Sequence, residues 1–198
     1  MTQAGSVRPG GRTARTRTAV LEAALDELAQ RGWDQVSVET IAARAGVHKT
    51  TVYRRWGGKD RLVAEALEAA AEHRIQIPDS GDVDQDLRTL ARAVLAILTS
   101  RDGAATVRAL VAGAQSSPEV GQVVRRFWAT RLGHVGPIVD RAVSRGQLPP
   151  GTDPDELLRY LAAPLFHRLL VTAEPLTPAT ADQAAAVVLA AARAGAFT

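Results

Sequence analysis

Apolar residues recur every three or four positions along nearly the whole 198-residue chain. Leu21, Ala24, Leu25 and Leu28 show this spacing first, and it persists into residues 178–194 near the C-terminus. Such spacing gathers the apolar side chains on one face of a helix. Val, Ile and Thr nowhere alternate with polar residues over the length of a strand. The pattern therefore predicts an all-α protein of about nine helices and no strands.

Turn-forming residues divide this helical pattern into two parts. The segment 78–82, with the sequence PDSGD, is the clearest boundary. Before it we expect helices at residues 13–31, 37–45, 48–56 and 59–75. After it we expect helices at residues 84–101, 104–115, 118–145, 154–172 and 178–194. Pro137 and Pro164 lie inside two of these, and each is expected to kink or break its helix because proline lacks an N–H group.

Charge is distributed unevenly along the chain. It has 24 Lys and Arg against 21 Asp and Glu, for a net charge of +3. Residues 1–61 hold 11 basic and 6 acidic side chains, and residues 62–198 hold 13 and 15. A basic first third indicates a polyanionic partner such as nucleic acid, with a solvated basic surface as the alternative.

Several classes of protein are disfavoured by residues that are missing. There is no cysteine, which excludes disulfides, Cys-ligated metals and a Cys nucleophile. No apolar run reaches the roughly 18 residues of a membrane span, so we expect a cytoplasmic protein without a membrane partner. The four histidines lack metal-binding spacing, and no phosphate-binding or dinucleotide-binding glycine motif occurs. An enzyme, a metal site and a cofactor are therefore not expected.

Residues 37–62, SVETIAARAGVHKTTVYRRWGGKDRL, carry the most information. A short helix ends near Gly46, and another begins at once. Glycine permits a positive φ in a tight turn, and the small Ala42 lets two helices cross closely. This is a helix-turn-helix pattern, although paired short helices also occur in ordinary all-α proteins. Trp33 and Trp56 lie beside these helices and are expected to fill the core.

The second helix of this pair is rich in groups that suit the major groove of DNA. It presents Lys49, Thr50, Thr51, Tyr53, Arg54 and Arg55 within seven residues. Lys and Arg neutralise phosphates or donate to guanine, and threonine methyl groups can contact thymine. This residue set favours double-stranded DNA as the partner.

The same segment resembles the DNA-binding signature of TetR-family regulators over roughly residues 15–65, about a quarter of the chain. The resemblance rests on Ile41-Ala42, Ala45-Gly46-Val47, Thr51-Val52-Tyr53, Trp56 and Lys59-Asp60-Arg61-Leu62. Two positions depart from the family pattern. His48 replaces the usual capping serine, and Arg55-Trp56 replaces the usual His-Phe pair.

The resemblance implies roles for individual residues. Ser37 would cap its helix and contact phosphate, Thr40 would face the edge of the groove, and Tyr53 would touch the sugar–phosphate backbone. Lys59 would hold a phosphate at the start of the fourth helix, helped by the helix dipole. The expected DNA-binding set is Ser37, Thr40, His48, Lys49, Thr50, Thr51, Tyr53, Arg54, Arg55 and Lys59.

In the family, the C-terminal part dimerises and binds a small molecule. The helix expected at 154–172 is apolar on two adjoining rows, and the last helix is rich in small residues, which favours a helical interface between two copies. The expected interface residues are Leu161, Leu165, Leu169, Ala184, Val188 and Ala191. The alternative is that both helices are internal to one chain.

A ligand pocket is expected near the two helical prolines. The candidate residues are Phe127, Trp128, Arg131, His134, Phe166 and His167. Such a set at helical spacing also occurs in ordinary cores and surfaces. Few charges would favour an apolar or aromatic ligand, whereas Arg131 could equally hold an anion, so the ligand class stays open.

These observations lead to one hypothesis. Residues 1–12 form a flexible basic arm that either enters a minor groove or is a disordered tail. Residues 13–58 form the DNA-binding domain, residues 59–77 a connecting helix, and residues 78–198 a ligand-binding and dimerisation domain. The resemblance implies a homodimeric repressor that leaves a palindromic operator when an unknown small-molecule effector binds. The alternatives are a transcriptional activator and an architectural DNA-binding protein of low specificity.

Overall fold

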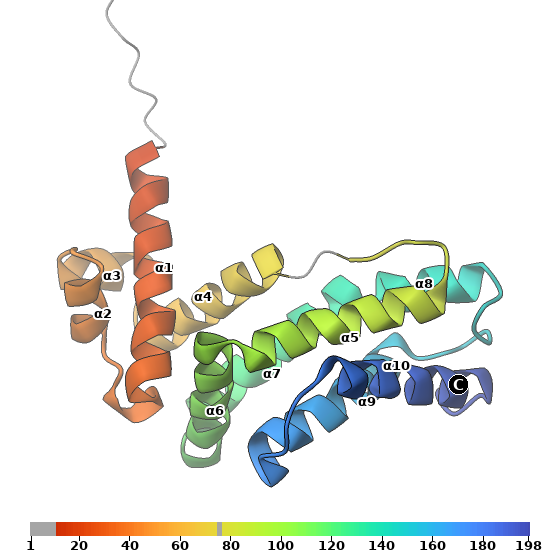
Figure 1. Ribbon diagram of the computed structural model, residues 1–198. Coiled ribbons are helices and arrows are strands. Elements are labelled where there is room, and N and C mark those ends of the chain that lie inside the picture. The colour runs from red at the N-terminus through yellow and green to blue at the C-terminus, as the bar shows by residue number, and fades with distance from the viewer. Residues whose placement is uncertain (1–10, 75–76) are drawn as a thin grey trace, which may run out of the picture.

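The computed structural model describes residues 11–74 and 77–198, and within them every regular element is helical (Figure 1). The N-terminal part consists of α1 (Gly11–Arg31), the 3₁₀ turn η1 (Trp33–Gln35), α2 (Val38–Arg44), α3 (Lys49–Trp56) and α4 (Lys59–Arg74). Helix α1 begins at Gly11, so the last two residues of the expected arm are helical. The rest of that arm, residues 1–10, lies outside the described residues.

The C-terminal part begins after the expected boundary at residues 78–82. It consists of α5 (Val83–Thr99), α6 (Arg101–Ser116), α7 (Pro118–Val135), α8 (Pro137–Ser144), α9 (Pro154–His167), the π-helical turn η2 (Arg168–Thr172) and α10 (Pro178–Arg193). The expected break at Pro137 is confirmed, because Gly136 separates α7 from α8. Helix α9 is not broken at Pro164, because it continues to His167 and then widens into η2. If α7 and α8 count as one interrupted helix, the described residues hold the expected nine.

Side-chain caps fix where these helices start. Ser37 and Thr40 form a capping box at α2, in which each side chain accepts a hydrogen bond from the other residue's backbone N–H. Thr177 and Thr180 repeat the arrangement at α10. Single side chains cap α5, α6, α7 and α9, namely Asp82, Ser100, Ser117 and Asp153. Each cap satisfies backbone donors that the first helical turn leaves unpaired.

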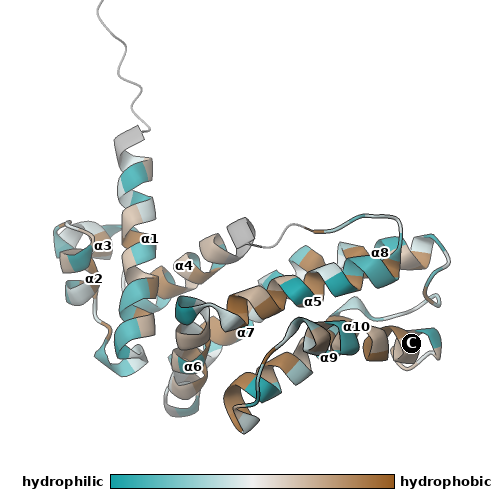
Figure 2. Ribbon diagram, viewed as in Figure 1, coloured by the Kyte–Doolittle hydropathy of each residue, from teal (hydrophilic) through white to brown (hydrophobic). Residues whose placement is uncertain are grey.

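Two groups of buried side chains hold the molecule together. The first joins α1–α4 to α6 and α7 and includes both Trp33 and Trp56, which confirms their expected place in the core. The second lies among α5, α7, α8, α9 and α10. Hydrophobic stretches along α5 and α9 belong to it (Figure 2).

The DNA-binding candidate region is packed on the C-terminal part rather than tethered to it. Helix α1 lies against α6, and α4 lies against α7. At Gly113 of α6, an added Cβ would come within 2.9 Å of the Cβ of Trp33, so only glycine lets η1 approach α6 this closely. Because of these contacts, a shift of α6 or α7 would also move the N-terminal helices.

Candidate nucleic-acid interface and internal cavity

A tight turn joins α2 to α3. Gly46 has a φ of +65°, a conformation that costs non-glycine residues about 1–2 kcal/mol. The Val47 N–H donates to the Ala42 carbonyl at 3.0 Å, which closes the turn. His48 is the N-cap of α3, where its Nδ1 accepts a 3.4 Å hydrogen bond from the Thr50 N–H. Histidine thus takes the capping place that serine usually holds.

Helix α3 has one buried and one exposed side. Val52 is 0% exposed and Trp56 is 4% exposed, so these two residues anchor the helix in the core. Every expected contact residue of α3 lies outside that core. His48, Lys49, Thr50, Tyr53, Arg54 and Arg55 are exposed, and Thr51 is half-buried. A short helix with a basic and hydroxyl-rich outer face has the shape and charge to enter a major groove.

Glu39 of α2 lies beside two of these contact candidates. Its Oε1 accepts a long, 3.5 Å hydrogen bond from the Tyr53 hydroxyl and lies 3.7 Å from the Lys49 ammonium. All three side chains are exposed, so these interactions are weak. A phosphate that approaches Tyr53 or Lys49 would compete with this carboxylate.

Lys59 has partners within the chain that the resemblance does not imply. Its Nζ donates to the carbonyls of Trp33 at 3.2 Å and Val36 at 3.1 Å, and it lies 4.7 Å from the centre of the Trp33 ring. The ammonium therefore binds the connection between α1 and α2. We propose that Lys59 holds η1 against the start of α4, in place of the phosphate contact that the resemblance implies.

Sequence reasoning missed Glu65, which joins three helices. Its Oε1 accepts from Arg17 of α1 at 2.6 Å, and its Oε2 accepts from the indole N–H of Trp56 in α3 at 2.8 Å. No local sequence signal relates positions 48 residues apart, so this group could be found only in the fold. Glu65 sets the orientation of α3 relative to α1 and α4.

A hollow between α1 and α3 adds Thr13, Thr16 and Arg17 of α1 to the expected contact residues of α3. It is lined by Thr13, Thr16, Arg17, Thr51, Arg54, Arg55 and Trp56. The hydroxyls of Thr13 and Thr16 and the guanidinium of Arg55 suit a backbone phosphate beside the recognition helix.

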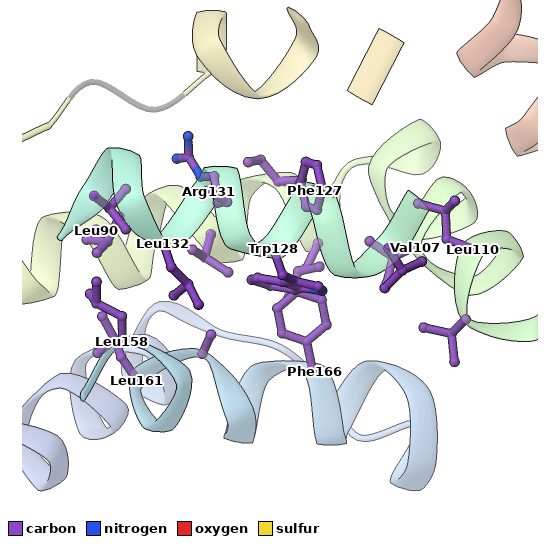
Figure 3. A pocket seen from close by; sticks show the side chains of 17 residues that line it. Leu90, Val107, Leu110, Phe127, Trp128, Arg131, Leu132, Leu158, Leu161 and Phe166 are labelled. Carbon is purple, nitrogen blue, oxygen red and sulfur yellow. The ribbon is translucent and has the colours of Figure 1, made fainter. Parts of the chain in front are cut away.

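A cavity of about 170 Å³ lies in the C-terminal part between α5, α6, α7 and α9 (Figure 3). Phe127, Trp128, Arg131 and Phe166 line it, as expected. Trp128 is the centre of its aromatic residues. The centre of the Trp128 ring lies 5.7 Å from that of Phe127 and 5.3 Å from that of Phe166, with the ring planes inclined at 73° and 71°. The structure therefore brings four of the six expected ligand residues together.

The other two expected ligand residues, His134 and His167, do not line this cavity. Both are exposed. Residues 128, 131, 132 and 135 share the inner side of α7, and position 134 falls on its outer side at 3.6 residues per turn. In α9, His167 follows the inward Phe166 by one position, about 100° around the helix. The expectation for these two histidines was wrong.

A second cavity of about 210 Å³ lies between the N-terminal helices and α5, α6 and α7. Phe127 and Arg131 also belong to its wall. Arg131 is 9% exposed, and burial lowers the pKa of its guanidinium from its ordinary value.

Part of the expected set of dimer residues needs correction. Leu161, Leu165 and Leu169 are buried inside a single chain, and Leu161 lines the first cavity. Ala184 and Val188 are also buried, and only Ala191 of the set is half-exposed. The reason is that α9 directs its broad apolar side inward. The outer hollow between α9 and α10 is lined by Ala184, Val188 and Ala191 of the expected set, together with residues that include Tyr160, Ala163, Pro164 and Val187.

Neither a metal cluster nor a membrane span is found in the part of the chain that the structure describes. No three or more His, Cys, Asp or Glu side chains of these residues gather as metal ligands. None of the described helices combines the length and the apolar character needed to cross a bilayer.

Comparison with known proteins identifies the family. Residues 20–66 match the family described as "Bacterial regulatory proteins, tetR family", and residues 77–188 match "Tetracyclin repressor-like, C-terminal domain". The chain belongs to the TetR family of bacterial transcriptional regulators. Members of this family are non-enzymatic DNA-binding proteins with a helix-turn-helix.

Individual TetR-family relatives cover most of the chain. The Bacillus subtilis protein "Uncharacterized HTH-type transcriptional regulator YdeS" is 31% identical over 160 residues, 80% of each chain. AqdR of Rhodococcus erythropolis, an HTH-type transcriptional regulator, is 35% identical over 72% of this chain and 68% of its own. The crystal structure of TetR family transcription regulator SCO0332 has a TM-score of 0.75 at 29% identity, covering 89% of this chain and 97% of that one.

Proposed function

We propose that this TetR-family regulator is a homodimeric repressor of a palindromic operator and that a small molecule bound in its C-terminal cavity releases it. The observation that carries the DNA-binding part is the outer side of α3. There the lysine, threonine, tyrosine and arginine side chains are exposed, while Val52 and Trp56 fix the helix in the core. Two such helices in a symmetric dimer would read half-sites about one turn of DNA apart.

The dimer is supported by the outer face of α9 and α10. Tyr160 and Val187 are 60% and 63% exposed there, although both are large hydrophobic residues. They line the same hollow as Ala163 and Pro164. Apolar side chains that gather on a surface favour a protein partner. A second copy would place the same face against itself, as two-fold symmetry requires.

Release by an effector is supported by the position of α7. This helix lines the cavity through Trp128 and packs against α4, which carries the DNA-binding helices. A ligand that fits the cavity better in one orientation of α7 than in another would shift the spacing of the two α3 helices. Such a ligand changes this spacing only because its affinities for the two orientations of α7 differ.

The test is selection of binding sites from a random duplex DNA pool with purified full-length protein at moderate salt. The proposal predicts an inverted repeat whose half-site centres lie about one helical turn apart. Binding without a recovered motif, abolished by added salt, would contradict the proposal and favour an architectural protein. Recovery of a single, unrepeated half-site would contradict the dimeric part. Whether the bound protein represses or activates is read from transcription in vitro on a promoter that carries the selected site.

A further inference from the structure

The sequence leaves open whether the cavity between α5, α6, α7 and α9 binds a neutral ligand or an anion, because Arg131 lies in its wall. The structure favours one answer. Sixteen of the seventeen residues that line the cavity are apolar, and Arg131 is the exception. The aliphatic residues come from four helices, and the aromatic ones gather around Trp128 (Figure 3).

The charged end of Arg131 does not face the aromatic centre of the cavity. Figure 3 shows its guanidinium on the side of α7 that faces α4, whereas Trp128 and Leu132 extend from the opposite side toward α9. On the guanidinium's side lies the second cavity, whose lining includes the carboxylates of Glu22, Asp26 and Asp102. The charged residues of that lining are these three acids and Arg131, a balance of three negative charges against one positive charge that disfavours an anionic ligand there.

A charged ligand would therefore lose its hydration without gaining a counter-ion in the cavity. Transfer of an ionised carboxylate or ammonium into an apolar environment is strongly unfavourable unless the charge is paired and hydrogen-bonded. An apolar ligand carries no such cost, and it gains dispersion contacts with the apolar side chains of the lining. Apolar cavities of roughly 150 Å³ stay dry and bind a molecule as large as benzene.

We infer that the cavity binds a neutral, apolar ligand about the size of one aromatic ring with a short alkyl chain, and that it discriminates against carboxylates. The inference rests on the proposed effector function of the cavity, whose volume is about 170 Å³. Trp128 and Phe166 already meet edge to face, an arrangement that an aromatic ligand can extend.

Phe127 limits the length of this ligand. Its ring belongs to the wall of both cavities, together with Ile97, Val107, Leu110 and Arg131. Removal of the ring should join the two spaces. Phe127→Ala should therefore increase the affinity for hexylbenzene relative to propylbenzene by at least fivefold. An unchanged ratio of the two affinities would contradict this role for Phe127.

The decisive experiment compares three probes that share one shape and differ in charge: n-propylbenzene, 3-phenylpropanoate and 3-phenylpropylammonium. Binding to the full-length protein is measured without DNA by calorimetry and by the change in tryptophan fluorescence. The expected result is that propylbenzene binds at least tenfold more tightly than either ion. Ala162→Leu, which fills the cavity, should weaken propylbenzene binding at least tenfold, and Val111→Phe is the second blocking variant. The control is Ala112→Leu, the same substitution at an exposed position next to Val111, which should alter the affinity for propylbenzene less than twofold.

Two results would overturn the inference. One is that 3-phenylpropanoate binds the wild type at least as tightly as propylbenzene does, and that Arg131→Met weakens the binding of 3-phenylpropanoate. The other is that none of the probes binds up to its limit of solubility. Operator binding is measured separately on the same protein. Its failure would count against the proposed function, whereas failure of the probes alone would count only against this ligand class.

Discussion

At the scale of single residues, the contacts of Lys59 favour a structural role over the phosphate contact that the resemblance implies. Its ammonium donates to the Trp33 and Val36 carbonyls, so we predict that Lys59→Met lowers the free energy of unfolding by about 1–3 kcal/mol. The slope of log affinity for DNA against log salt should stay unchanged, because no phosphate contact is lost. Urea unfolding and salt titrations check both expectations. A slope lower by about one, with unchanged stability, would restore the phosphate contact.

Arg54 is the residue of α3 for which we expect the clearest effect on base preference. It is exposed, on the outer side of the helix. Arg54→Ala should change the preferred base at one position of each half-site, at a cost of about 1–3 kcal/mol for the original base. Arg193→Ala, which removes the same charge from the exposed end of α10, is the control. Selection from random DNA gives the readout, and an identical motif for Arg54→Ala and wild type would refute the assignment.

At the scale of elements, the buried carboxylate of Glu27 joins α1 to α2. Its Oε1 accepts from Arg44 at 2.7 Å, and its Oε2 lies 3.1 Å from the Arg31 Nε. Burial raises the pKa of Glu27, but the Arg44 hydrogen bond and the charges of Arg31 and Arg44 outweigh it. The pKa therefore lies below its ordinary 4.5. A carboxyl with a lower pKa when folded contributes stability above its unfolded pKa and loses it as the pH falls through its folded pKa.

This linkage predicts how Glu27→Gln depends on pH. At pH 7 the variant should be less stable than wild type by about 1–3 kcal/mol, since hydrogen bonds to a charged group are lost. The difference should shrink as the pH falls below 4.5, because the wild-type carboxyl becomes neutral as well. Urea unfolding at several pH values measures it, with the exposed Glu22→Gln on the same helix as the control. A difference that stays constant down to the acid transition would contradict the assignment.

The contact between α6 and η1 makes a second prediction at this scale. Gly113→Ala would place a Cβ within 2.9 Å of Trp33, so we expect a net destabilisation of about 1–2 kcal/mol in spite of alanine's higher helix propensity. Gly121→Ala, in α7, is the matched control. Its nearest neighbour is the end of the flexible Arg125 side chain, and it should be neutral or stabilising. Thermal unfolding compares the two variants, and equal effects would refute the close contact.

The sequence predicted local structure well and predicted long-range packing poorly. Helical spacing and caps located the helices to within a few residues, and the helix-turn-helix followed from a continuous segment. The leucines expected in the dimer interface lie inside one chain, because periodicity shows that α9 is broadly apolar but not which neighbour covers each side. Leu161 and Leu165 proved internal. Glu65 went unnoticed because its partners Arg17 and Trp56 are brought to it only by the fold.

At the scale of the whole molecule, the proposed dimer predicts that Val187→Arg separates the two copies. This side chain is 63% exposed in one chain and would be buried, as an unpaired charge, between two. Sedimentation should show monomers at concentrations where wild type is dimeric. Affinity for an isolated half-site should be unchanged. A dimeric Val187→Arg would place the interface on another face.

The symmetric dimer that reads DNA through two α3 helices is tested most directly by a binding titration with two duplexes of equal length. One carries the selected inverted repeat, and the other carries the same sequence with one half-site scrambled. Two chains should bind the intact repeat together, and the scrambled duplex should bind at least a hundredfold more weakly at the same salt concentration. Equal affinities for the two duplexes would contradict a symmetric dimer that reads DNA through two α3 helices.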